Sequence, residues 1–375
     1  MAMLESPVLV LNAGSSSLKA AVVAADGAIL WRGQRPWHPE LGPPLERHPQ
    51  HPLDPGVRDQ LVDLLREWLA PPLASWLDPG GSGQALAAHR VVHGGERFTA
   101  PTQVGPELLA ELRALLPLAP LHNGPALQLM EALARWQPQL DQWACFDTAF
   151  HASLPPAART YAIPRSWRDA GLRRFGFHGL NHQHVAETVA LLRPQTRRLI
   201  SCHLGAGCSL CAVRDGRSIA TTMGFTPLEG LVMASRSGSV DPGVLLHQLR
   251  HGVDVDALEE ALQSQSGLLG LSELSGDMQH LRQARLAGHA GAALAIDVFR
   301  DRLLQGIGAM AASLGGVDAI ALTGGIGEHD EALRLELAEA LGWLGPVPLL
   351  VIPADEEGLI ARICRDAAAR LDAAG

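Results

Sequence analysis

A strand, a small polar turn and a second strand occur twice in the chain, and this repeat limits its possible folds more than any other feature. In the first copy an apolar run at residues 8–11 ends at a polar turn, and a second apolar run follows it. The second copy occupies residues 199–216, and in both copies the second run ends at an Asp-Gly turn. Such turns connect adjacent strands, so we expect a third strand over residues 28–31.

The repeat predicts the architecture of the whole chain. Ser17 and Leu18 in the first copy correspond to Ser209 and Leu210 in the second, and the two pairs lie about half of the 375-residue chain apart. Self-similarity at half the chain length predicts two lobes of similar plan. Because strands alternate with helical segments, the expected fold class is α/β, with two hairpin-bearing lobes that face each other across a cleft.

The first turn carries residue types that bind phosphate. It contains Asn12, Gly14, serines at residues 15–17, and then Lys19. Glycine lets a ligand approach the backbone, hydroxyl and N–H groups bind anionic oxygens, and lysine supplies a point charge. The turn leads into a strand and lacks the G-x-x-x-x-G-K-[ST] pattern, so it is not the common P-loop. A hairpin whose polar turn faces solvent is the alternative.

Composition excludes several classes of function. The net charge is −9 and the charged residues are dispersed along the chain, so we expect no basic surface that could bind nucleic acid. We expect no membrane span, because no apolar stretch reaches about 18 residues. We also expect no signal peptide, because Glu5 and no basic region precede the first apolar run. The five cysteines lie mostly in apolar runs and are expected to be buried, reduced thiols of a cytoplasmic protein.

Two charged residues lie within or directly after predicted strands. Arg90 is surrounded by small and apolar residues, and an arginine in such a place is costly unless it is paired. It either forms a structural salt bridge or directs its guanidinium at a phosphate or carboxylate. Asp147 follows an apolar run that starts at Trp143. A carboxylate at the end of such a strand suits a ligand or metal, and could equally cap the next turn.

A histidine-rich segment raises the possibility of a zinc site. His178 and His182 have the spacing of a helical metal pair, but glycine follows the first histidine and the H-E-x-x-H glutamate is absent. A hydrogen-bonding His178 in a polar cleft is therefore the preferred interpretation. Cysteines near His203 suggest a second zinc possibility, but Cys208 and Cys211 would point to opposite faces of a strand.

The second half of the chain contains an arginine and a glycine-rich turn with functional potential. Arg236 lies among small residues and could bind an anion or be a solvated loop charge. An apolar run at residues 317–323 ends at Gly324, Gly325 and Gly327. Such a turn allows close approach of a nucleotide to the backbone.

Periodicity assigns the remaining segments. Helices are expected over residues 60–69, 106–118, 124–136, 182–192, 242–251, 254–263 and 288–314, and another begins within 353–357. Loops are expected over residues 36–55, 71–83 and 266–272, and an inner strand over 349–352.

Taken together, these segments resemble the acetate kinase family, which includes propionate kinases and belongs to the superfamily of sugar kinases, heat-shock ATPases and actin. The agreement covers residues 8–362. The matching motifs are NAGSSSLK at residues 12–19, HRVVHGGE at 89–96, FDTAFH at 146–151, FGFHG at 175–179, MGFTPLEG at 223–230, RSG at 236–238 and GGIGE at 324–328.

The resemblance implies a fold, an activity and an assembly. It implies two similar lobes of the actin-like ATPase (ribonuclease H-like) type with a nucleotide cleft between them. The N-terminal lobe would span residues 1–149, completed by a helix at 358–375, and the nucleotide-binding lobe 150–357. It implies reversible, Mg²⁺- or Mn²⁺-dependent phosphoryl transfer between ATP and acetate, giving acetyl phosphate and ADP, by a cytoplasmic homodimer without nucleic-acid or membrane partners.

The resemblance also implies site residues. A carboxylate acceptor is already ionised at pH 7 and needs no general base, so Asp147 is interpreted as metal-organising. The implied catalytic residues are Arg90, Asp147, His178 and Arg236. The implied phosphate and nucleotide contacts are Asn12, Ser15, Ser17, Lys19, His203, Gly205, Gly207, Asp277, Gly324, Gly325, Ile326 and Gly327. The acceptor pocket would be Val92, Leu121, Phe177 and Pro227, and the metal ligands Asn12, Asp147 and Glu356.

Departures from the family pattern leave alternatives open. Ala206 replaces an asparagine in the second hairpin, His329 replaces another after the glycine-rich turn, and Met278 and Gln279 replace an aromatic residue and an arginine near the base. Propionate kinase and a weakly catalytic, regulatory nucleotide binder are therefore alternatives. A serine acyl-enzyme is a further one, because Ser16 begins an S-x-x-K motif, although the S-D-N and K-T-G partner motifs are absent.

Overall fold

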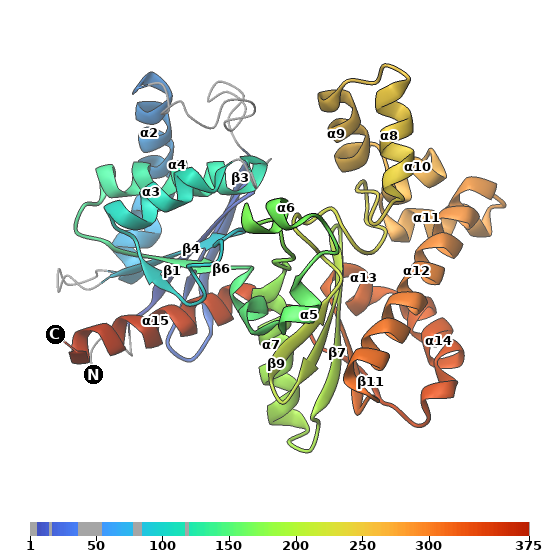
Figure 1. The fold of residues 1–375 in the computed structure, drawn as a ribbon. Helices are drawn as coiled ribbons and strands as arrows, with labels where there is room; N and C mark the ends of the chain where they lie inside the picture. Colours follow the sequence, from blue (N-terminus) through green and yellow to red (C-terminus); the bar gives the residue numbers. More distant parts are fainter. Residues whose placement is uncertain (1–5, 15–16, 37–54, 78–84, 117–119, 375) are drawn as a thin grey trace. The chain divides into compact units, whose positions relative to one another are not determined.

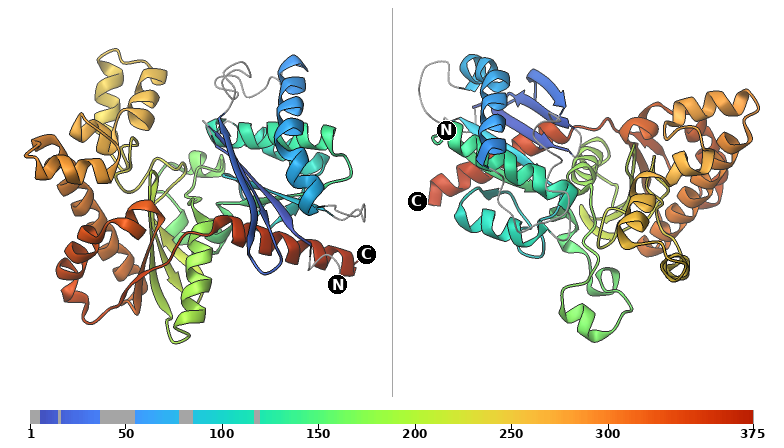
Figure 2. Two further views of the ribbon diagram at one scale, coloured as in Figure 1. Left: turned by 180° about the vertical axis from the view of Figure 1, so that it is seen from behind. Right: turned by 90° about the horizontal axis from the view of Figure 1, so that it is seen from above.

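The computed structural model describes residues 6–14, 17–36, 55–77, 85–116 and 120–374 (Figure 1). Two compact units form, one from Met1–Ala149 with Asp355–Gly375 and the other from Phe150–Ala354. They are called unit 1 and unit 2 below. Each contains one mixed β-sheet with helices packed on it (Figures 1 and 2), which confirms the α/β class. No helix in the described part of the chain is long and apolar enough to cross a membrane.

Unit 1 is built on a six-stranded sheet. Its strand order is β3-β2-β1-β4-β6-β5, in which β1 pairs antiparallel with β2 and parallel with β4. The elements are β1 (Val8–Ala13), β2 (Ser17–Val23), β3 (Ile29–Pro36), α2 (Pro55–Pro72), η2 (Leu73–Leu77), β4 (Leu86–Val91), β5 (Thr102–Gln103), α3 (Pro106–Ala114), α4 (Pro120–Trp136), β6 (Asp141–Phe146) and α15 (Glu356–Ala374). The short helix η4 (Ala149–Ser153) follows β6.

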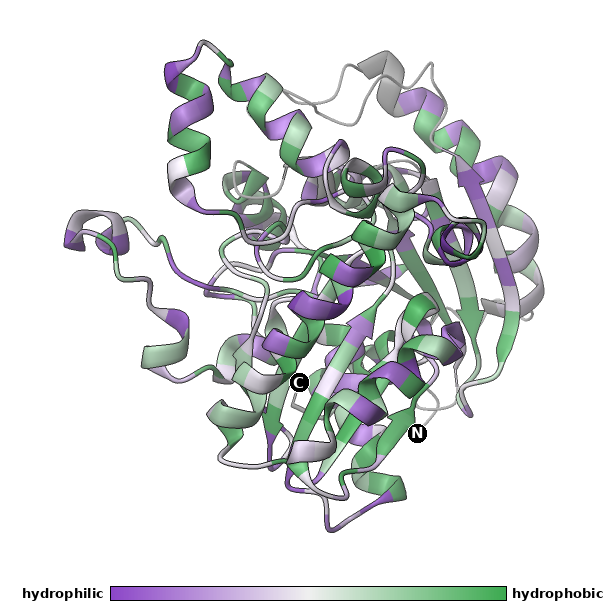
Figure 3. Cartoon of the chain, turned by 90° about the vertical axis from the view of Figure 1, so that its right-hand side faces the viewer, coloured by the Kyte–Doolittle hydropathy of each residue, from purple (hydrophilic) through white to green (hydrophobic). Residues whose placement is uncertain are grey.

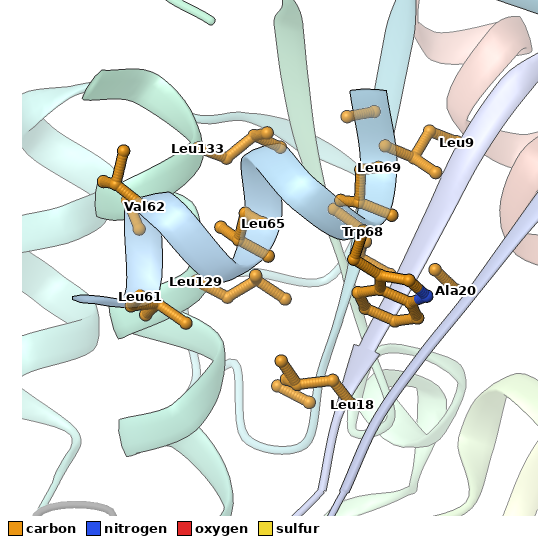
Figure 4. Close-up of a cluster of buried hydrophobic side chains, with 14 of the residues drawn as sticks. Leu9, Leu18, Ala20, Leu61, Val62, Leu65, Trp68, Leu69, Leu129 and Leu133 are labelled. Carbon is orange, nitrogen blue, oxygen red and sulfur yellow. The ribbon is translucent and has the colours of Figure 1, made fainter. Parts of the chain in front are cut away.

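The core of unit 1 follows from side-chain alternation along the strands. Leu9 of β1 and Leu18 of β2 point to one face, where they meet Leu65 of α2 and Leu129 of α4 (Figure 4). Successive strand residues point to opposite faces, so the neighbours of these leucines face α15, which packs against β1, β2, β4 and β6. The sheet is therefore covered on both faces, by α2 with α4 and by α15.

Unit 2 contains a five-stranded sheet of order β11-β10-β7-β8-β9. The elements are α5 (Pro156–Arg159), α6 (Arg165–Asp169), α7 (Gly179–Leu192), β7 (Arg198–Leu204), β8 (Cys208–Arg214), β9 (Arg217–Thr221), α8 (Pro242–Arg250), α9 (Val255–Ser264), α10 (Gly267–Ser272), α11 (Met278–Leu286), α12 (Ala290–Leu314), β10 (Ala319–Thr323), α13 (Gly324–His329), α14 (Glu331–Ala340), η5 (Gly342–Leu344) and β11 (Leu349–Val351).

Two helices cover opposite faces of the unit 2 sheet. Val185 and Val189 of α7 pack on Cys211 and Ala321. On the other face α12 lies so close that a β-carbon at Gly306 would be 2.7 Å from Cδ1 of Leu210. Figure 3 shows hydrophobic residues gathered along the strands, whereas the helices alternate between hydrophobic and hydrophilic residues. Burial on both faces explains why the strands of this sheet are nearly continuous apolar runs.

The predicted internal repeat is confirmed by the topology. In each unit three antiparallel strands are followed by two parallel ones, so the order β3-β2-β1-β4-β6 corresponds to β9-β8-β7-β10-β11. The hairpins close at Ala13–Leu18 in unit 1 and at Leu204–Cys208 in unit 2. The second turn is therefore one residue shorter than the first. Counted from the closing pairs, Ser209 corresponds to Lys19, so the correspondence with Ser17 taken from the sequence was wrong.

One predicted loop is a helix. Within the expected loop at 266–272, residues Gly267–Ser272 form α10, in which Leu268 is fully buried and which packs against α12. Gly267, one of the glycines that suggested a loop, is instead required by backbone conformation and close packing. Gly267 has φ +62, and a β-carbon there would lie 2.3 Å from the carbonyl oxygen of Met233. Tertiary packing therefore decides the conformation of this segment.

Two further segments differ from the prediction, and one predicted loop falls mainly on residues that the structure does not describe. Helix α2 continues to Pro72 and η2 follows it, where a loop was expected, because Leu73 packs against the unit 1 core. The expected inner strand at 349–352 is the edge strand β11, and its side chains are only partly buried. The loop predicted at 36–55 falls mainly on residues 37–54, outside the described residues.

Candidate active site

A row of polar side chains crosses three strands of the unit 1 sheet beside its hairpin turn. Asn12 of β1 is paired with Lys19 of β2 on one side and with Arg90 of β4 on the other. Paired residues of neighbouring strands point to the same face. Lys19 is exposed, whereas Asn12 and Arg90 are half-buried. We call these three residues the charged row.

Arg90 joins the charged row to two carboxylates. Its Nη2 lies 2.7 Å from Oδ2 of Asp147 and its Nε 3.2 Å from Oδ1, so the guanidinium binds Asp147 with two parallel hydrogen bonds. The same Nε lies 3.3 Å from Oε2 of Glu356, the first residue of α15. The structure thus brings together three residues that are far apart in the sequence. The salt bridge considered for Arg90 is present.

The environment of this cluster sets its charge state. Burial raises the pKa of Asp147 to about 6, with Arg90 opposing the shift and Glu356 adding to it. For Arg90, burial lowers the pKa, but the two neighbouring carboxylates outweigh it and the pKa is raised. Arg90 therefore stays protonated. One guanidinium faces two carboxylates here, which leaves net negative charge able to attract a cation when both are ionised.

The donor atoms of unit 1 fit a magnesium ion. The carboxylates of Asp147 and Glu356 and the amide of Asn12 offer the hard oxygen ligands that Mg²⁺ prefers, and Mg²⁺ is commonly bound through one or two carboxylates together with substrate phosphates. Among the described residues, no three or more His, Cys, Asp or Glu side chains are grouped so that they could hold a metal by themselves. The donor set thus suits a metal shared with a phosphate ligand.

Two cysteines of unit 2, Cys208 and Cys211, form hydrogen bonds through their thiols. Cys208 donates through Sγ to the carbonyl oxygen of Gly205, and Cys211 donates to Oγ of Ser218. Burial raises the pKa of both thiols to about 12, so they keep their protons. All five cysteines are free and buried, as predicted. A protonated, hydrogen-bonded thiol is a poor zinc ligand.

Unit 2 has a corresponding row beside its own hairpin. His203 of β7 pairs with Ser209 of β8 and with Thr323 of β10. Ser209 and Thr323 are fully buried. We call these three residues the neutral row. The turn beside it is closed by a hydrogen bond from the N–H of Gly205 to the carbonyl oxygen of Gly207.

His178 lies directly before α7 and reaches the neutral row. Its backbone is left-handed, with φ 57, which is uncommon for a residue other than glycine. Its Nδ1 is 2.8 Å from Oγ of Ser209, and its ring centroid is 4.3 Å from that of His203. A β-carbon at Gly207 would lie 3.1 Å from its Nε2 and 3.8 Å from Nη1 of Arg236. His178 and Arg236 therefore converge on the glycine of the hairpin turn.

The residues predicted for the acceptor pocket are distributed over both units. In unit 2, Phe177 and Pro227 are buried, and Arg236 donates from Nη1 to the carbonyl oxygen of Pro227 at 3.3 Å. Val92 is half-buried in unit 1. Leu121 belongs to α4, but its side chain is outside those that the structure describes.

Two other predicted phosphate contacts lie at the unit 1 turn. Ser15 lies outside the described residues. Ser17 opens β2 and is half-buried, and its carbonyl oxygen accepts from the N–H of Gly14 at 2.9 Å. The turn of unit 1 is thereby closed by one backbone hydrogen bond, as the turn of unit 2 is.

A cavity of about 940 Å³ in unit 2 has the size of a ligand pocket. Four predicted nucleotide contacts line it, as do all four residues that depart from the family pattern. The first set is Gly205, Asp277, Gly325 and Ile326, and the second is Ala206, Met278, Gln279 and His329. The predicted residues His203, Gly207, Gly324 and Gly327 do not line the cavity.

Backbone geometry explains the first glycine of the turn after β10. Gly324 has φ +78, and a β-carbon there would lie 2.8 Å from the carbonyl oxygen of Leu204. Its N–H donates to Oε1 of Glu328, which also accepts from the N–H of Ala354. The role of Gly324 is therefore conformational: its left-handed backbone allows the chain to turn so that the next residue, Gly325, lies at the cavity wall.

Sequence reasoning missed several residues that organise unit 2. Arg174 donates to the carbonyl oxygen of Met223 at 2.8 Å and pairs with Glu229, which also accepts from the hydroxyl of Tyr161. These contacts hold the loop that carries Pro227. Their only sequence signal was an arginine directly before one family motif and a glutamate within another, because residues so far apart in the chain are paired by tertiary packing alone.

Fold and site together define a class of protein. Two α/β units of repeated topology, a hairpin turn with converging cationic and hydrogen-bonding groups, and a ligand-sized cavity beside it are features of two-lobed kinases with the actin-like ATPase fold. The family model described as the Acetokinase family matches residues 81–362. The chain therefore belongs to the acetokinase family.

Individual relatives agree with this assignment. An acetate kinase from Synechococcus sp. is 43% identical, with 96% of this chain and 98% of the relative covered. The crystal structure of Porphyromonas gingivalis acetate kinase superposes with a TM-score of 0.84 at 30% identity and covers 98% of this chain and 100% of that one. A propionate kinase from Francisella tularensis also superposes with a TM-score of 0.84, at 31% identity, covering 96% and 98%.

Proposed function

We propose that this enzyme transfers the γ-phosphoryl group of ATP reversibly to acetate, giving acetyl phosphate and ADP. The observation that carries the proposal is the convergence of His178 Nε2 and Arg236 Nη1 on Gly207, in the turn whose other residues border the 940 Å³ cavity. A cation and a hydrogen-bond donor beside a nucleotide-sized cavity are what a transferring phosphoryl group requires.

In the proposed mechanism the protein positions the reactants and neutralises charge. A carboxylate oxygen of acetate attacks the γ-phosphorus, the bond from that phosphorus to the bridging oxygen breaks, and ADP leaves with the electron pair. Arg236 and His178 donate to the oxygens of the transferring group, where negative charge is spread in the transition state. From the family resemblance, Arg90 would hold the acceptor carboxylate, and the pocket for the acceptor's methyl group would be Val92, Leu121, Phe177 and Pro227. No proton has to be removed from the acceptor.

The proposed nucleotide site follows the cavity. Gly325 and Ile326 would lie against the adenine, and Asp277, at the cavity wall, would face the ribose. The phosphates would meet the backbone N–H groups near Gly205 and Gly207, with His203 beside them. The phosphate-binding residues of unit 1 would be Asn12, Ser15, Ser17 and Lys19.

We also propose Mg²⁺, or Mn²⁺ in its place, as the cofactor. When bound, the metal neutralises charge on the phosphate oxygens and holds them in line for transfer. Asp147, Glu356 and Asn12 would hold it. Arg90 lies beside the same two carboxylates.

For assembly and location we propose a cytoplasmic homodimer. Five free, buried cysteines suit a reducing compartment. The net charge of −9 offers nothing to nucleic acid. The dimer rests on the resemblance to the family, and light scattering of the purified chain tests it.

The test of the activity is magnesium-dependent phosphoryl transfer from ATP to acetate, propionate and butyrate in parallel, with the acyl phosphate trapped by hydroxylamine. We expect the strongest signal with acetate. A stronger signal with propionate would favour the activity named for the Francisella relative, since one methylene is worth about 1–3 kcal/mol in a pocket. If no acid reacts with ATP, other nucleotides and pyrophosphate are tested as donors. Failure with every donor in folded protein contradicts the proposal.

A further inference from the structure

A chain of buried hydrogen bonds leads from the sheet of unit 2 to His178. Oγ of Ser201 lies 2.8 Å from Nδ1 of His182, and Nε2 of His182 lies 2.8 Å from Oγ of Ser209. Ser209 in turn lies 2.8 Å from Nδ1 of His178. Ser201, His182 and Ser209 are each fully buried. None of the three has a role in the function proposed above.

Ser201, the first member of this series of hydrogen bonds, determines the direction of all the others. Among the described residues, the hydroxyl of Ser201 has one hydrogen-bond partner, Nδ1 of His182. A buried hydroxyl hydrogen without an acceptor is costly, so Ser201 donates and Nδ1 of His182 accepts. Burial, together with the nearby His151 and His203, lowers the pKa of His182 well below its usual value, so the ring is neutral.

The remaining bonds then follow in order. A neutral imidazole that accepts at Nδ1 carries its hydrogen on Nε2. His182 therefore donates from Nε2 to Ser209. Among the described residues, the Ser209 hydroxyl has only His182 and His178 as side-chain partners. Because His182 donates to it and a buried hydroxyl hydrogen needs an acceptor, the Ser209 hydrogen goes to Nδ1 of His178. A neutral His178 that accepts at Nδ1 carries its hydrogen on Nε2, the atom that faces Gly207 and Arg236.

A second relay of the same kind holds the backbone of His178. His151 lies 3.0 Å through Nε2 from the carbonyl oxygen of Phe177, and 2.9 Å through Nδ1 from Oγ of Ser218. A carbonyl oxygen only accepts, so His151 donates from Nε2 and accepts at Nδ1. The approach depends on Gly176, where φ is +81 and a β-carbon would lie 2.7 Å from Cδ2 of His151. The hydrogen bond to Phe177 therefore holds the backbone directly before His178, the residue with the left-handed conformation.

We infer that Ser201, His182 and Ser209 are positioning residues that fix His178 in the tautomer with its hydrogen on Nε2, while His151 fixes its backbone. The inference rests on the proposed function for its consequence, because an Nε2–H donates to a phosphoryl oxygen whereas the other tautomer presents a lone pair to it. The relay thus prepares the donor before substrate arrives, which is how preorganised groups accelerate charge development.

The direct test is nuclear magnetic resonance of the full chain labelled with ¹⁵N in the histidine rings, at a pH well above the ordinary imidazole pKa of about 6.5. The His178 signals are assigned by their loss in His178→Gln. We expect a pyrrole-type Nε2 and a pyridine-type Nδ1 in the native chain, and values averaged between tautomers in Ser201→Ala. Hydrogen on Nδ1 in the native chain, or an unchanged spectrum in Ser201→Ala, would overturn the inference.

A double-mutant cycle tests the consequence for turnover. Ser201→Ala should lower kcat about five- to tenfold, the usual effect of one hydrogen bond, with KM changed by less than about twofold. In the His178→Ala background the same substitution should change kcat by less than about twofold, because its effect passes through His178. An equal loss in both backgrounds would overturn the inference.

The matched control is His184→Gln. This histidine also lies on α7, but its Nε2 is hydrogen-bonded to the carbonyl oxygen of Pro353. It should leave both kcat and the His178 ring signals unchanged. If the native chain forms no acyl phosphate, the proposed function fails, while the ring spectrum still decides the inference about the tautomer.

Discussion

The charged row of unit 1 and the neutral row of unit 2 occupy the same place in the same topology, yet they have opposite chemistry. Each lies one pair beyond the closing pair of its hairpin and extends onto the parallel strand next to it. One row offers two cationic side chains and an amide, the other a serine, a histidine and a threonine. The repeated backbone therefore fixes where functional groups stand, and the side chains decide what they do.

The helix that starts beside each row continues the contrast. In unit 1, α15 begins with Glu356, which pairs with Arg90. In unit 2, α7 is preceded by His178, which bonds to Ser209. Charge requires water or a counter-charge, and the charged row has both. A neutral group needs only hydrogen-bond partners, and Ser209 has two, His178 and His182, so this member of the neutral row can be fully buried and held in place.

The largest effect is expected from removing the charge of Arg90. Arg90→Gln should lower turnover about 10²–10³-fold, the cost of losing a preorganised electrostatic group. It should also destabilise unit 1 by about 3–5 kcal/mol, because Asp147 is buried and loses its counter-charge. Acyl phosphate formation and urea unfolding measure the two effects.

A second substitution separates stability from catalysis at this cluster. Arg90→Gln with Asp147→Asn should restore much of the unfolding free energy but not turnover. Arg97→Gln is the matched control, since Arg97 pairs with Glu111 at the surface of the same unit and should matter to neither. If the double substitution restored turnover, charge in the row would not be needed, and the contrast with unit 2 would be wrong.

Buried histidines should make both units sensitive to acid, although their rows differ. Burial lowers the pKa of His89 in unit 1 and of His151 in unit 2 to about 4. Between about pH 6.5 and 4 the unfolded chain binds more protons at these residues than the folded chain, so stability rises with pH in this window and is lost as pH falls. Each residue should contribute on the order of 3 kcal/mol at the acid end.

Urea unfolding at several pH values checks this expectation. His89→Gln and His151→Gln should each flatten the pH dependence, since each removes one group that must be protonated on unfolding. A flat profile in the unsubstituted chain between pH 7 and 5 would contradict the predicted coupling. A profile changed by only one of the two variants would show that the units differ in acid sensitivity as they do in their rows.

The sequence predicted the positions of these rows better than their content. Both hairpins, the strand before Asp147 and the long helix α12 were readable from apolar runs, glycine turns and helical period. The one-residue difference between the turns was not, because nothing in the composition of Gly205 and Gly207 states which residues close a hairpin. The register that places Ser209 opposite His203 therefore emerged only from the structure.

Tertiary pairing accounts for what else was missed. The ion pair of Arg90 with Asp147 was one of two alternatives in the sequence, because local pattern cannot identify a partner 57 residues away. His182 was considered as a zinc ligand and as the start of a helix. Its true partners, Ser201 and Ser209, lie on adjacent antiparallel strands. In the sequence these serines looked like any small strand residue and did not indicate a role, although a buried serine usually has a hydrogen-bond partner.

Exchanging arginine and lysine changes the shape of a cationic side chain without changing its charge, and this should distinguish the two units further. Arg236→Lys keeps the positive charge in unit 2 but loses the planar fork, and we expect turnover to fall about 10–100-fold. Lys19→Arg makes the reverse exchange in the charged row and should have the smaller effect, because Lys19 is exposed and acts as a point charge. Steady-state kcat for both variants decides. Equal losses would show that unit 1 depends on geometry as strongly as unit 2.

The smallest effect is expected at the tip of the shorter turn, where Ala206 replaces the family's asparagine. Ala206 is exposed at the cavity wall, and its carbonyl oxygen accepts from the N–H of Ala234, so the backbone at the tip is already fixed. Ala206→Asn should add one polar contact to phosphate and lower the Kd for ATP about three- to tenfold, the value of a single hydrogen bond.

Ala206→Leu has a similar shape without the amide and should not tighten binding. Calorimetric titration of both variants separates the polar contact from added bulk. Tighter binding by the leucine variant alone would mean that the cavity wall favours apolar contact there.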